Sequence, residues 1–290
     1  MMVVPGPASQ NLGSSVAGLL GIHATSVESK VFPDGESYIR FDKKLADEDV
    51  VIIQSTYPPQ NKHLLELFLM LDTAREQGAK TLTAVVPYLA YARQDKVFRD
   101  GEALSARTIV RLIEASGATS FMAFDVHQPK TLSLFRIPAK DISATPAIAD
   151  FLKKQDLEDP FVLAPDAGAS NRAKALGESL ATDHGFFEKQ RDRVTGRVMT
   201  VEKTIEISGR DAVIIDDMIT TGSSVANVAA IIKRQGAHRI LAVCTHPLLQ
   251  EGAVDRLVRS GVETVIGTDC IESPISRISV APLVADAVRR

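Results

Sequence analysis

The sequence predicts an α/β fold made of two consecutive parallel-sheet domains of similar design. Short β-branched runs alternate with amphipathic stretches along both halves of the chain. This alternation is typical of a parallel sheet covered by helices on both faces. A length of 290 residues exceeds the usual size of one hydrophobic core, so we expect two domains.

The first half of the chain contains three predicted strands separated by two predicted helices. The strands are residues 50–54, 82–86 and 121–124, and the helices are residues 64–77 and 104–116. The second half repeats this order, with strands at 161–164, 212–215 and 240–244 and helices at 173–181 and 224–235. Residues 278–288 form a further apolar strand and helix that we assign to no sheet.

The two halves also resemble each other locally. Residues 51–53 lead to Gly78 as residues 213–215 lead to Gly236, and a β-branched run follows each glycine. Glycine after the last helical turn is a common helix end, so both segments read as βαβ crossovers. Chance similarity between two ordinary crossovers is the alternative. We place the domain break at Pro146 and its neighbours, giving domains of residues 1–142 and 143–276, with 277–290 as a candidate addition to the first.

Composition excludes several classes of protein. The formal net charge of -3 argues against a general nucleic-acid binder, because such binding needs a basic surface. Cys244 and Cys270 form no CxxC pair and are too few for a disulfide framework, so we expect a cytoplasmic protein. No apolar run reaches the length needed to cross a bilayer, and we expect no membrane partner.

The strongest motif is an apolar strand, residues 213–215, followed by two carboxylates and a hydroxyl-rich turn that opens a helix. The small residues of this turn allow backbone N–H groups to surround a phosphate at a helix N-terminus. Asp216 and Asp217 would repel that phosphate, so they suit hydroxyl groups elsewhere on the same ligand. The alternative is an ordinary turn with a serine N-cap. The turn consists of Thr220, Thr221, Gly222, Ser223 and Ser224.

Two further groups carry chemistry of a less specific kind. Lys189 and Arg191 are alternating cations that suit polyphosphate oxygens, although a solvated loop would have the same pattern. Asp125 and His127 alternate at the end of the strand 121–124, so we expect both on one side of the chain, where they suit a metal or a phosphate. A hydrogen-bonded structural histidine is the alternative.

The residues 213–224 resemble the phosphoribosyl-binding loop of type I phosphoribosyltransferases and of phosphoribosyl pyrophosphate synthases. Five other segments are similar to the synthases alone, and they occur in that family's order along nearly the whole chain. They are residues 32–36 (FPDGE), 91–96 (YARQDK), 125–127 (DVH), 165–168 (PDAG) and 189–191 (KQR).

This resemblance implies a phosphoribosyltransferase-like fold and an enzyme that transfers the β,γ-diphosphate of MgATP to ribose 5-phosphate. It implies Lys189 and Arg191 as catalytic cations, and Asp216, Asp217 and residues 220–224 as the ribose 5-phosphate site. It implies Mg²⁺ ligation by His127 and Asp166, and at least a homodimer, because the family shares its ATP pocket across a subunit boundary. The implied ATP-binding residues are Phe32, Asp34, Glu36, Arg93, Gln94, Asp95 and His127.

The sequence also departs from the family's usual pattern. Residues 220–224 read TTGSS where many bacterial members carry DTAGT, and residues 167–169 read AGA where His-Gly-Gly is familiar. Taken alone, FPDGE is only a turn. Two rival functions therefore stay open: a phosphoribosyltransferase, which would need no adenylate pocket, and a catalytically silent regulatory subunit. No GxxxxGK[ST] segment occurs, which argues against a P-loop kinase.

Overall fold

The computed structural model describes residues 1–191, 198–201 and 204–289. The chain divides into two compact units, each with its own parallel sheet. Unit 1 contains Met1–Ser143, Asp269–Glu272 and Ser279–Arg290, and unit 2 contains Ala144–Thr268 and Ser273–Ile278. The main passage from unit 1 to unit 2 thus follows Ser143, and the chain returns to unit 1 at its end.

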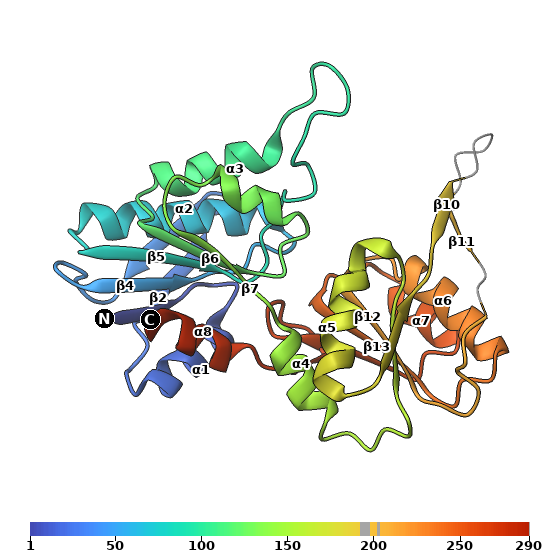
Figure 1. Cartoon of the computed structure of the whole chain (residues 1–290). Coiled ribbons are helices and arrows are strands. Elements are labelled where there is room, and N and C mark those ends of the chain that lie inside the picture. The colour runs from blue at the N-terminus through green and yellow to red at the C-terminus, as the bar shows by residue number, and fades with distance from the viewer. Residues whose placement is uncertain (192–197, 202–203, 290) are drawn as a thin grey trace. The chain divides into compact units, whose positions relative to one another are not determined.

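Unit 1 is built on a five-stranded parallel sheet of order β1-β4-β5-β6-β7. Helices α2 and α3 lie on one face of this sheet and α1 and α8 on the other (Figure 1). The strands are β1 (Met2–Pro5), β4 (Asp49–Ile53), β5 (Thr81–Val86), β6 (Ser120–Phe124) and β7 (Ala139–Ile142). The helices are α1 (Gln10–Leu20), α2 (Gln60–Glu76), α3 (Ser105–Ala115), the 3₁₀ turn η1 (Pro129–Leu134) and α8 (Ala281–Arg289).

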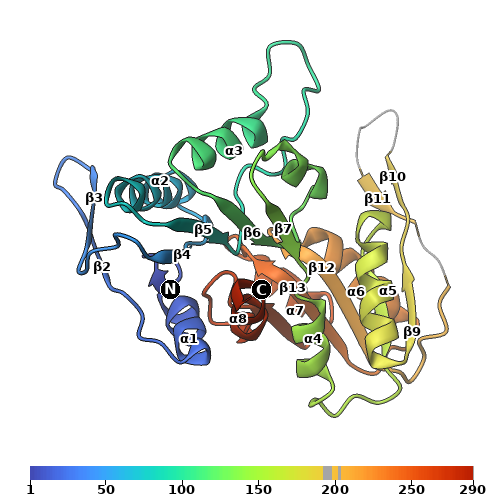
Figure 2. The same ribbon diagram turned by 60° about the vertical axis from the view of Figure 1, so that its left-hand side comes forward.

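A separate antiparallel hairpin belongs to unit 1. Strands β2 (Val27–Val31) and β3 (Ser37–Phe41) pair from Val27 opposite Phe41 to Val31 opposite Ser37. The hairpin forms a two-stranded ribbon at one side of the unit (Figure 2). Its tip, residues 32–36, is solvent-exposed throughout.

Unit 2 is built on a six-stranded parallel sheet of order β15-β14-β13-β12-β8-β9. Helices α4 and α5 lie to one side of it and α6 and α7 to the other (Figure 1). The strands are β8 (Phe161–Ala164), β9 (Asp183–Phe186), β12 (Ala212–Ile219), β13 (Ile240–Pro247), β14 (Thr264–Thr268) and β15 (Ser276–Ile278). The helices are α4 (Thr145–Leu152), the 3₁₀ turn η2 (Ala167–Ala169), α5 (Ser170–Leu180), α6 (Ser223–Arg234) and α7 (Ala253–Arg259), and β10 (Lys189–Arg191) pairs antiparallel with β11 (Val198–Thr200).

The predicted βαβ crossovers are confirmed in both units. Strand β4 pairs parallel with β5 across α2, and β12 pairs parallel with β13 across α6. Gly78 and Gly236 follow these helices with φ of 84° and 89°, in the left-handed region that favours glycine. The central strands are buried on both faces, as parallel strands covered by helices must be.

Three sequence-based expectations need adjustment. The residues around Pro146, where we placed the domain break, are not an interruption between elements: Thr145 and Pro146 form the first turn of α4, where the missing N–H of proline costs no hydrogen bond. The C-terminal strand joins the unit 2 sheet as β15, while the C-terminal helix α8 packs on α1 in unit 1. Strand β12 runs to Ile219, four residues beyond the predicted end at Ile215, because β13 continues alongside it. None of the described helices is long and apolar enough to cross a membrane.

Candidate active site

The acidic pair Asp216 and Asp217 lies inside strand β12 and not after it. Asp216 is opposite Cys244 of β13, and Met218 is opposite His246. The prediction of a strand that ends before the acids is therefore wrong. The backbone N–H of Asp217 donates to Asp216 Oδ1 at 2.9 Å, and the N–H of Met218 donates to Asp217 Oδ1 at 2.9 Å. These bonds fix two adjacent carboxylates near the carboxyl end of a buried strand.

Burial gives the acidic pair an unusual charge state. Asp217 is 6% exposed and Asp216 is half-buried. Desolvation, the neighbouring charge of Asp217 and a side-chain hydrogen bond to it raise the pKa of Asp216 to about 8, and the charge of Asp166 adds to the effect. A pKa of about 8 favours a protonated Asp216 at neutral pH, so the pair carries less than its full formal charge.

We expect this raised pKa to make the free protein less stable as the pH rises. The folded state keeps a proton on Asp216 between about pH 4 and pH 8 that the unfolded chain has lost, so stability falls across this window. The substitution Asp216→Asn should remove on the order of 2 kcal/mol of that decline. Urea unfolding at several pH values measures it, with Asp255→Asn on an exposed position as control. Parallel pH profiles for the wild type and Asp216→Asn would refute the shift.

The loop 220–224 begins directly after β12, and its last two residues already belong to helix α6. Gly222 is the residue before the helix, with φ of 74°, and α6 begins at Ser223. The Thr221 hydroxyl donates to Ser223 Oγ at 3.1 Å. The loop therefore has the predicted position at a helix N-terminus, although neither serine caps the helix through its side chain. A helix N-terminus with small residues is suited to an anion.

Asp166 lies at the end of β8, the strand next to β12 in the sheet. Its Oδ1 accepts from the N–H of Gly168 at 2.9 Å, so the carboxylate caps the short turn η2. Because Asp166 contributes to the shifted pKa of Asp216, the structure brings these two predicted residues into electrostatic range. Unit 2 thus has three carboxylates and a loop of small residues at a helix N-terminus near the carboxyl ends of its central strands.

Lys189 and Arg191 are the two ends of strand β10, which pairs with β11 from Lys189 opposite Thr200 to Arg191 opposite Val198. Their positions in the backbone are described, whereas their side chains lie outside the described part of the structure. Their assignment as catalytic cations stays a prediction.

In unit 1, the segment 32–36 forms the tip of the β2–β3 hairpin. The N–H of Phe32 donates to the carbonyl of Glu36 at 2.8 Å, and the N–H of Glu36 donates to Asp34 Oδ1 at 3.2 Å. Phe32 is 41% exposed and meets Tyr38 edge to face at 5.7 Å between ring centroids. Lys30 Nζ lies 4.3 Å from the centroid of the Tyr38 ring. The tip offers an open aromatic face beside two carboxylates.

Arg93, Gln94 and Asp95 follow strand β5 and form no helix or strand. The N–H of Gln94 donates to the carbonyl of Tyr91 at 3.3 Å, and the loop beyond them projects from unit 1 before α3 (Figure 1). Glu102 closes this loop by accepting from the N–H groups of Phe98 and Arg99 at 2.9 and 3.1 Å. Phe98 is 67% exposed, so the loop has little packing to hold it.

Asp125 and His127 do not continue the strand alternation that the sequence predicts. Strand β6 ends at Phe124, and Asp125 has φ of 40°, which breaks the extended backbone. Asp125 is buried and His127 is exposed, so the expectation that both lie on one side of the chain is wrong. His127 nevertheless follows β6 closely, at the carboxyl end of the strand that pairs with β5.

No group of three or more histidine, cysteine, aspartate or glutamate side chains among the described residues has a metal-binding arrangement. The donor chemistry still suits Mg²⁺, which binds through one or two carboxylates and keeps several water molecules. Asp166 and the acidic pair supply such carboxylates in unit 2. Desolvation is the main cause of the raised Asp216 pKa, and repulsion by Asp217 adds to it; a divalent cation relieves such repulsion between carboxylates.

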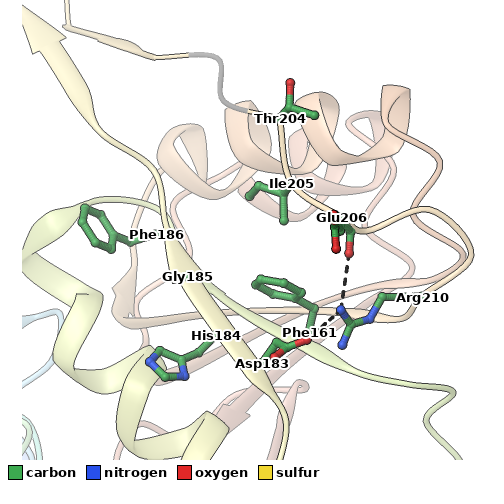
Figure 3. A pocket seen from close by; sticks show the side chains of 9 residues that line it. All are labelled: Phe161, Asp183, His184, Gly185, Phe186, Thr204, Ile205, Glu206 and Arg210. Carbon is green, nitrogen blue, oxygen red and sulfur yellow. Dashed lines mark hydrogen bonds and ion pairs between the residues drawn. The ribbon is translucent and has the colours of Figure 1, made fainter.

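A cavity of about 330 Å³ lies on unit 2 at the edge strand β9, and none of the residues that line it was predicted for the site (Figure 3). Its only arginine, Arg210, donates to Asp183 Oδ2 at 2.9 Å and pairs with Asp159 at 2.9 Å. The guanidinium also covers the ring of Phe161, 5.0 Å from its centroid. Two carboxylates neutralise this cation and Glu206 adds another, so the cavity does not suit a phosphate.

Comparison with known proteins gives matches over the whole chain. A family model described as the N-terminal domain of ribose phosphate pyrophosphokinase matches residues 1–117, and one described as the phosphoribosyl synthetase-associated domain matches residues 189–290. The ribose-phosphate pyrophosphokinase of Saccharolobus solfataricus is 43% identical over 93% of both chains. That of Methanothermobacter thermautotrophicus is 39% identical over 99% of this chain and 100% of its own.

The fold agrees with these sequence matches. The crystal structure of phosphoribosylpyrophosphate synthetase from Mycobacterium smegmatis superposes with a TM-score of 0.88, at 29% identity, over 99% of this chain and 97% of that one. Each of these three proteins matches residues of both units of this chain. The carboxylates and loop of unit 2 and the exposed hairpin of unit 1 are therefore parts of one shared architecture, and the chain belongs to the ribose-phosphate pyrophosphokinase family.

Proposed function

We propose that the chain transfers the β,γ-diphosphate of MgATP to the C1 hydroxyl of ribose 5-phosphate, giving phosphoribosyl pyrophosphate and AMP for nucleotide biosynthesis. The observation that carries this proposal is the full-length similarity to ribose-phosphate pyrophosphokinases. The six segments predicted to form the site are distributed over both units. A phosphoribosyltransferase, which binds no ATP, would not need the segments of unit 1.

The sugar phosphate is assigned to unit 2. Residues 220–224 hold the 5-phosphate at the N-terminus of α6, and Asp216 and Asp217 accept hydrogen bonds from the ribose hydroxyls. The support is the order of these groups along one strand and its following loop, which separates the acids from the anion site by a few residues. With the phosphate anchored, the C1 hydroxyl is the free nucleophile.

The reaction is an in-line displacement at the β-phosphorus. A bond forms between the C1 oxygen and that phosphorus, the bond to the α,β-bridging oxygen breaks, and AMP leaves with this oxygen. The hydroxyl proton passes to solvent. Lys189 and Arg191 bind the β- and γ-groups as one travelling unit, and they stabilise the charge that builds up during transfer without accepting a proton.

The nucleotide is assigned to unit 1. Phe32 stacks on adenine, and Asp34 and Glu36 accept from its exocyclic amine. Arg93, Gln94, Asp95 and His127 bind the rest of the nucleotide. The exposure of the hairpin tip supports a pocket that a second subunit completes, so we propose a homodimer or a multiple of dimers.

Mg²⁺ is assigned to Asp166 and His127, with the acidic pair near by. When bound, Mg²⁺ neutralises charge on the transferring diphosphate. Asp166 is oriented for this task by its bond to the Gly168 N–H. Both cysteines are free and buried, which supports a reducing, cytoplasmic setting.

The test is phosphorus NMR of the purified chain with MgATP and ribose 5-phosphate. We expect AMP and a C1 diphosphate to appear in equal amounts, and no turnover once Mg²⁺ is chelated. Stoichiometric ADP would contradict diphosphate transfer and indicate an ordinary kinase. If the chain turns over no ATP but consumes phosphoribosyl pyrophosphate when a nucleobase is added, the result would favour a phosphoribosyltransferase. If it is inactive in both assays, the result would favour a regulatory subunit.

A further inference from the structure

Two carbonyl groups at the start of the loop 220–224 are held by the segment that follows β13. The N–H of Leu249 donates to the carbonyl of Ile219 at 2.9 Å, and the N–H of Gln250 donates to the carbonyl of Thr220 at 2.9 Å. Both donors are backbone groups, so side-chain substitutions leave them in place. The first two peptide groups of the loop are therefore fixed by the fold itself.

The third carbonyl is held by a side chain. Arg256 of helix α7 donates from Nη1 to the carbonyl of Thr221 at 2.5 Å, and the same nitrogen lies 3.4 Å from Ser223 Oγ. Arg256 is exposed on the surface of α7 and forms a charge-assisted bond at this point. It was not among the residues that the sequence predicts for the site.

These three bonds determine where the loop's N–H groups point. A trans peptide carries its C=O and N–H on opposite sides, and the only cis bond among the described residues is Pro58-Pro59. With the carbonyls of residues 219–221 turned toward the 249–256 segment, the N–H groups of residues 220–222 point away from it. Successive N–H groups on one side of a turn form an anion-binding concavity.

The peptide between Thr221 and Gly222 is the one most able to rotate. A half-turn of this peptide changes ψ of Thr221 and φ of Gly222, and glycine accepts both signs of φ. The flipped peptide would direct its carbonyl oxygen at the bound anion. Helix α7 packs closely behind the glycine, since a Cβ added there would meet Leu257 Cγ at 3.1 Å and the Ala253 carbonyl at 3.3 Å.

We propose that Arg256 is a positioning residue for the 5-phosphate of the sugar: it locks the Thr221–Gly222 peptide with its N–H toward the phosphate and its carbonyl away. This inference rests on the proposed assignment of loop 220–224 to ribose 5-phosphate. Arg256 lies outside the loop, on helix α7, and its guanidinium fixes the direction of the loop's N–H group. The same guanidinium places positive charge beside Ser223.

The test measures kcat, both KM values and the Kd for ribose 5-phosphate by calorimetry in four proteins: wild type, Arg256→Ala, Arg256→Lys and Arg259→Ala. Arg256→Ala should raise the KM and Kd for ribose 5-phosphate on the order of 10-fold, because one charge-assisted bond is lost. Its KM for MgATP should stay within about twofold. Arg256→Lys should recover part of the affinity, and Arg259→Ala, on the same helix, should match the wild type.

An unchanged Kd for ribose 5-phosphate in Arg256→Ala would overturn the proposal. Equal losses for both substrates, with a lowered Tm that Arg256→Lys does not recover, would also overturn it, since that pattern means general destabilisation of α7. If the wild type itself forms no AMP from the two substrates, the proposed function fails and not this inference alone. An active wild type with a normal Arg256→Ala variant refutes the positioning role only.

Discussion

Replacement of Lys189 or Arg191 by alanine is expected to lower kcat by on the order of 10² to 10⁴, with little change in affinity for ribose 5-phosphate. The two residues lie at the ends of β10. In diphosphate transfer the protein contributes mainly positioning and charge stabilisation, so loss of one cation acts on the transition state more than on ground-state binding. Steady-state kinetics with each substrate varied in turn measure both effects.

A matched control for this experiment is Lys174→Ala. Lys174 is an exposed cation of the same unit, on α5, and its ammonium lies 3.9 Å from Glu178 in a surface pair. This variant should keep wild-type kinetics, because a screened surface pair has no connection to the site. Near-normal turnover in Lys189→Ala or Arg191→Ala would remove that residue from the mechanism.

A large effect of another kind is expected from Asp211→Ala, which should destabilise unit 2 by about 3 to 5 kcal/mol. The Asp211 side chain is fully buried at the amino end of β12. It accepts from Arg239 Nη2 at 2.5 Å, from His238 Nδ1 at 3.0 Å and from the N–H of Glu158 at 2.7 Å. Removing the carboxylate leaves these donors without their common acceptor, and urea unfolding measures the loss.

The pH dependence gives this prediction a second readout. Burial raises the pKa of Asp211, but hydrogen bonds from Arg239, the Glu158 amide and His238 outweigh it and lower the pKa overall. Its stabilisation is thus complete above about pH 4 and disappears only as the pH falls through the lowered folded pKa. Glu178→Ala, which removes an exposed carboxylate, should cost less than about 0.5 kcal/mol. A loss equally small in Asp211→Ala would contradict the burial argument.

The alternation of apolar runs predicted the central strands and helices within a few residues, because strands buried on both faces leave a continuous hydrophobic signal. The alternation did not predict the strands at the edges of the unit 1 sheet. Strand β1 lies in a start rich in proline, and β7 has only four residues, of which two are exposed. The extension of β12 through Asp216 and Asp217 was also missed, since two adjacent acids argue against a strand until a partner strand is present beside them.

The site was predictable where its chemistry lies in consecutive residues. The position of the loop before α6 follows from local sequence, and the structure places it at a helix N-terminus as expected, whereas the cap that Asp166 forms on η2 was not predicted. Arg256 could not be predicted in this way, because an arginine at an exposed helical position is common and no neighbouring residue in the sequence marks it as part of a site. Its contact with Thr221 joins residues 35 apart in sequence, and only the packing of α7 against the loop reveals it.

The position of helix α8 has a consequence for how the protein is made. Its residues Val284 and Ala285 are buried in unit 1 against α1, and Arg289 donates to the carbonyl of Leu19 at 2.5 Å. During synthesis, the strands of the unit 1 sheet are made before those of unit 2, yet helix α8 of unit 1 is made only after β15 of unit 2. Unit 1 is therefore completed only after the unit 2 strands have been made, and the apolar surface that α8 covers stays exposed in the interval.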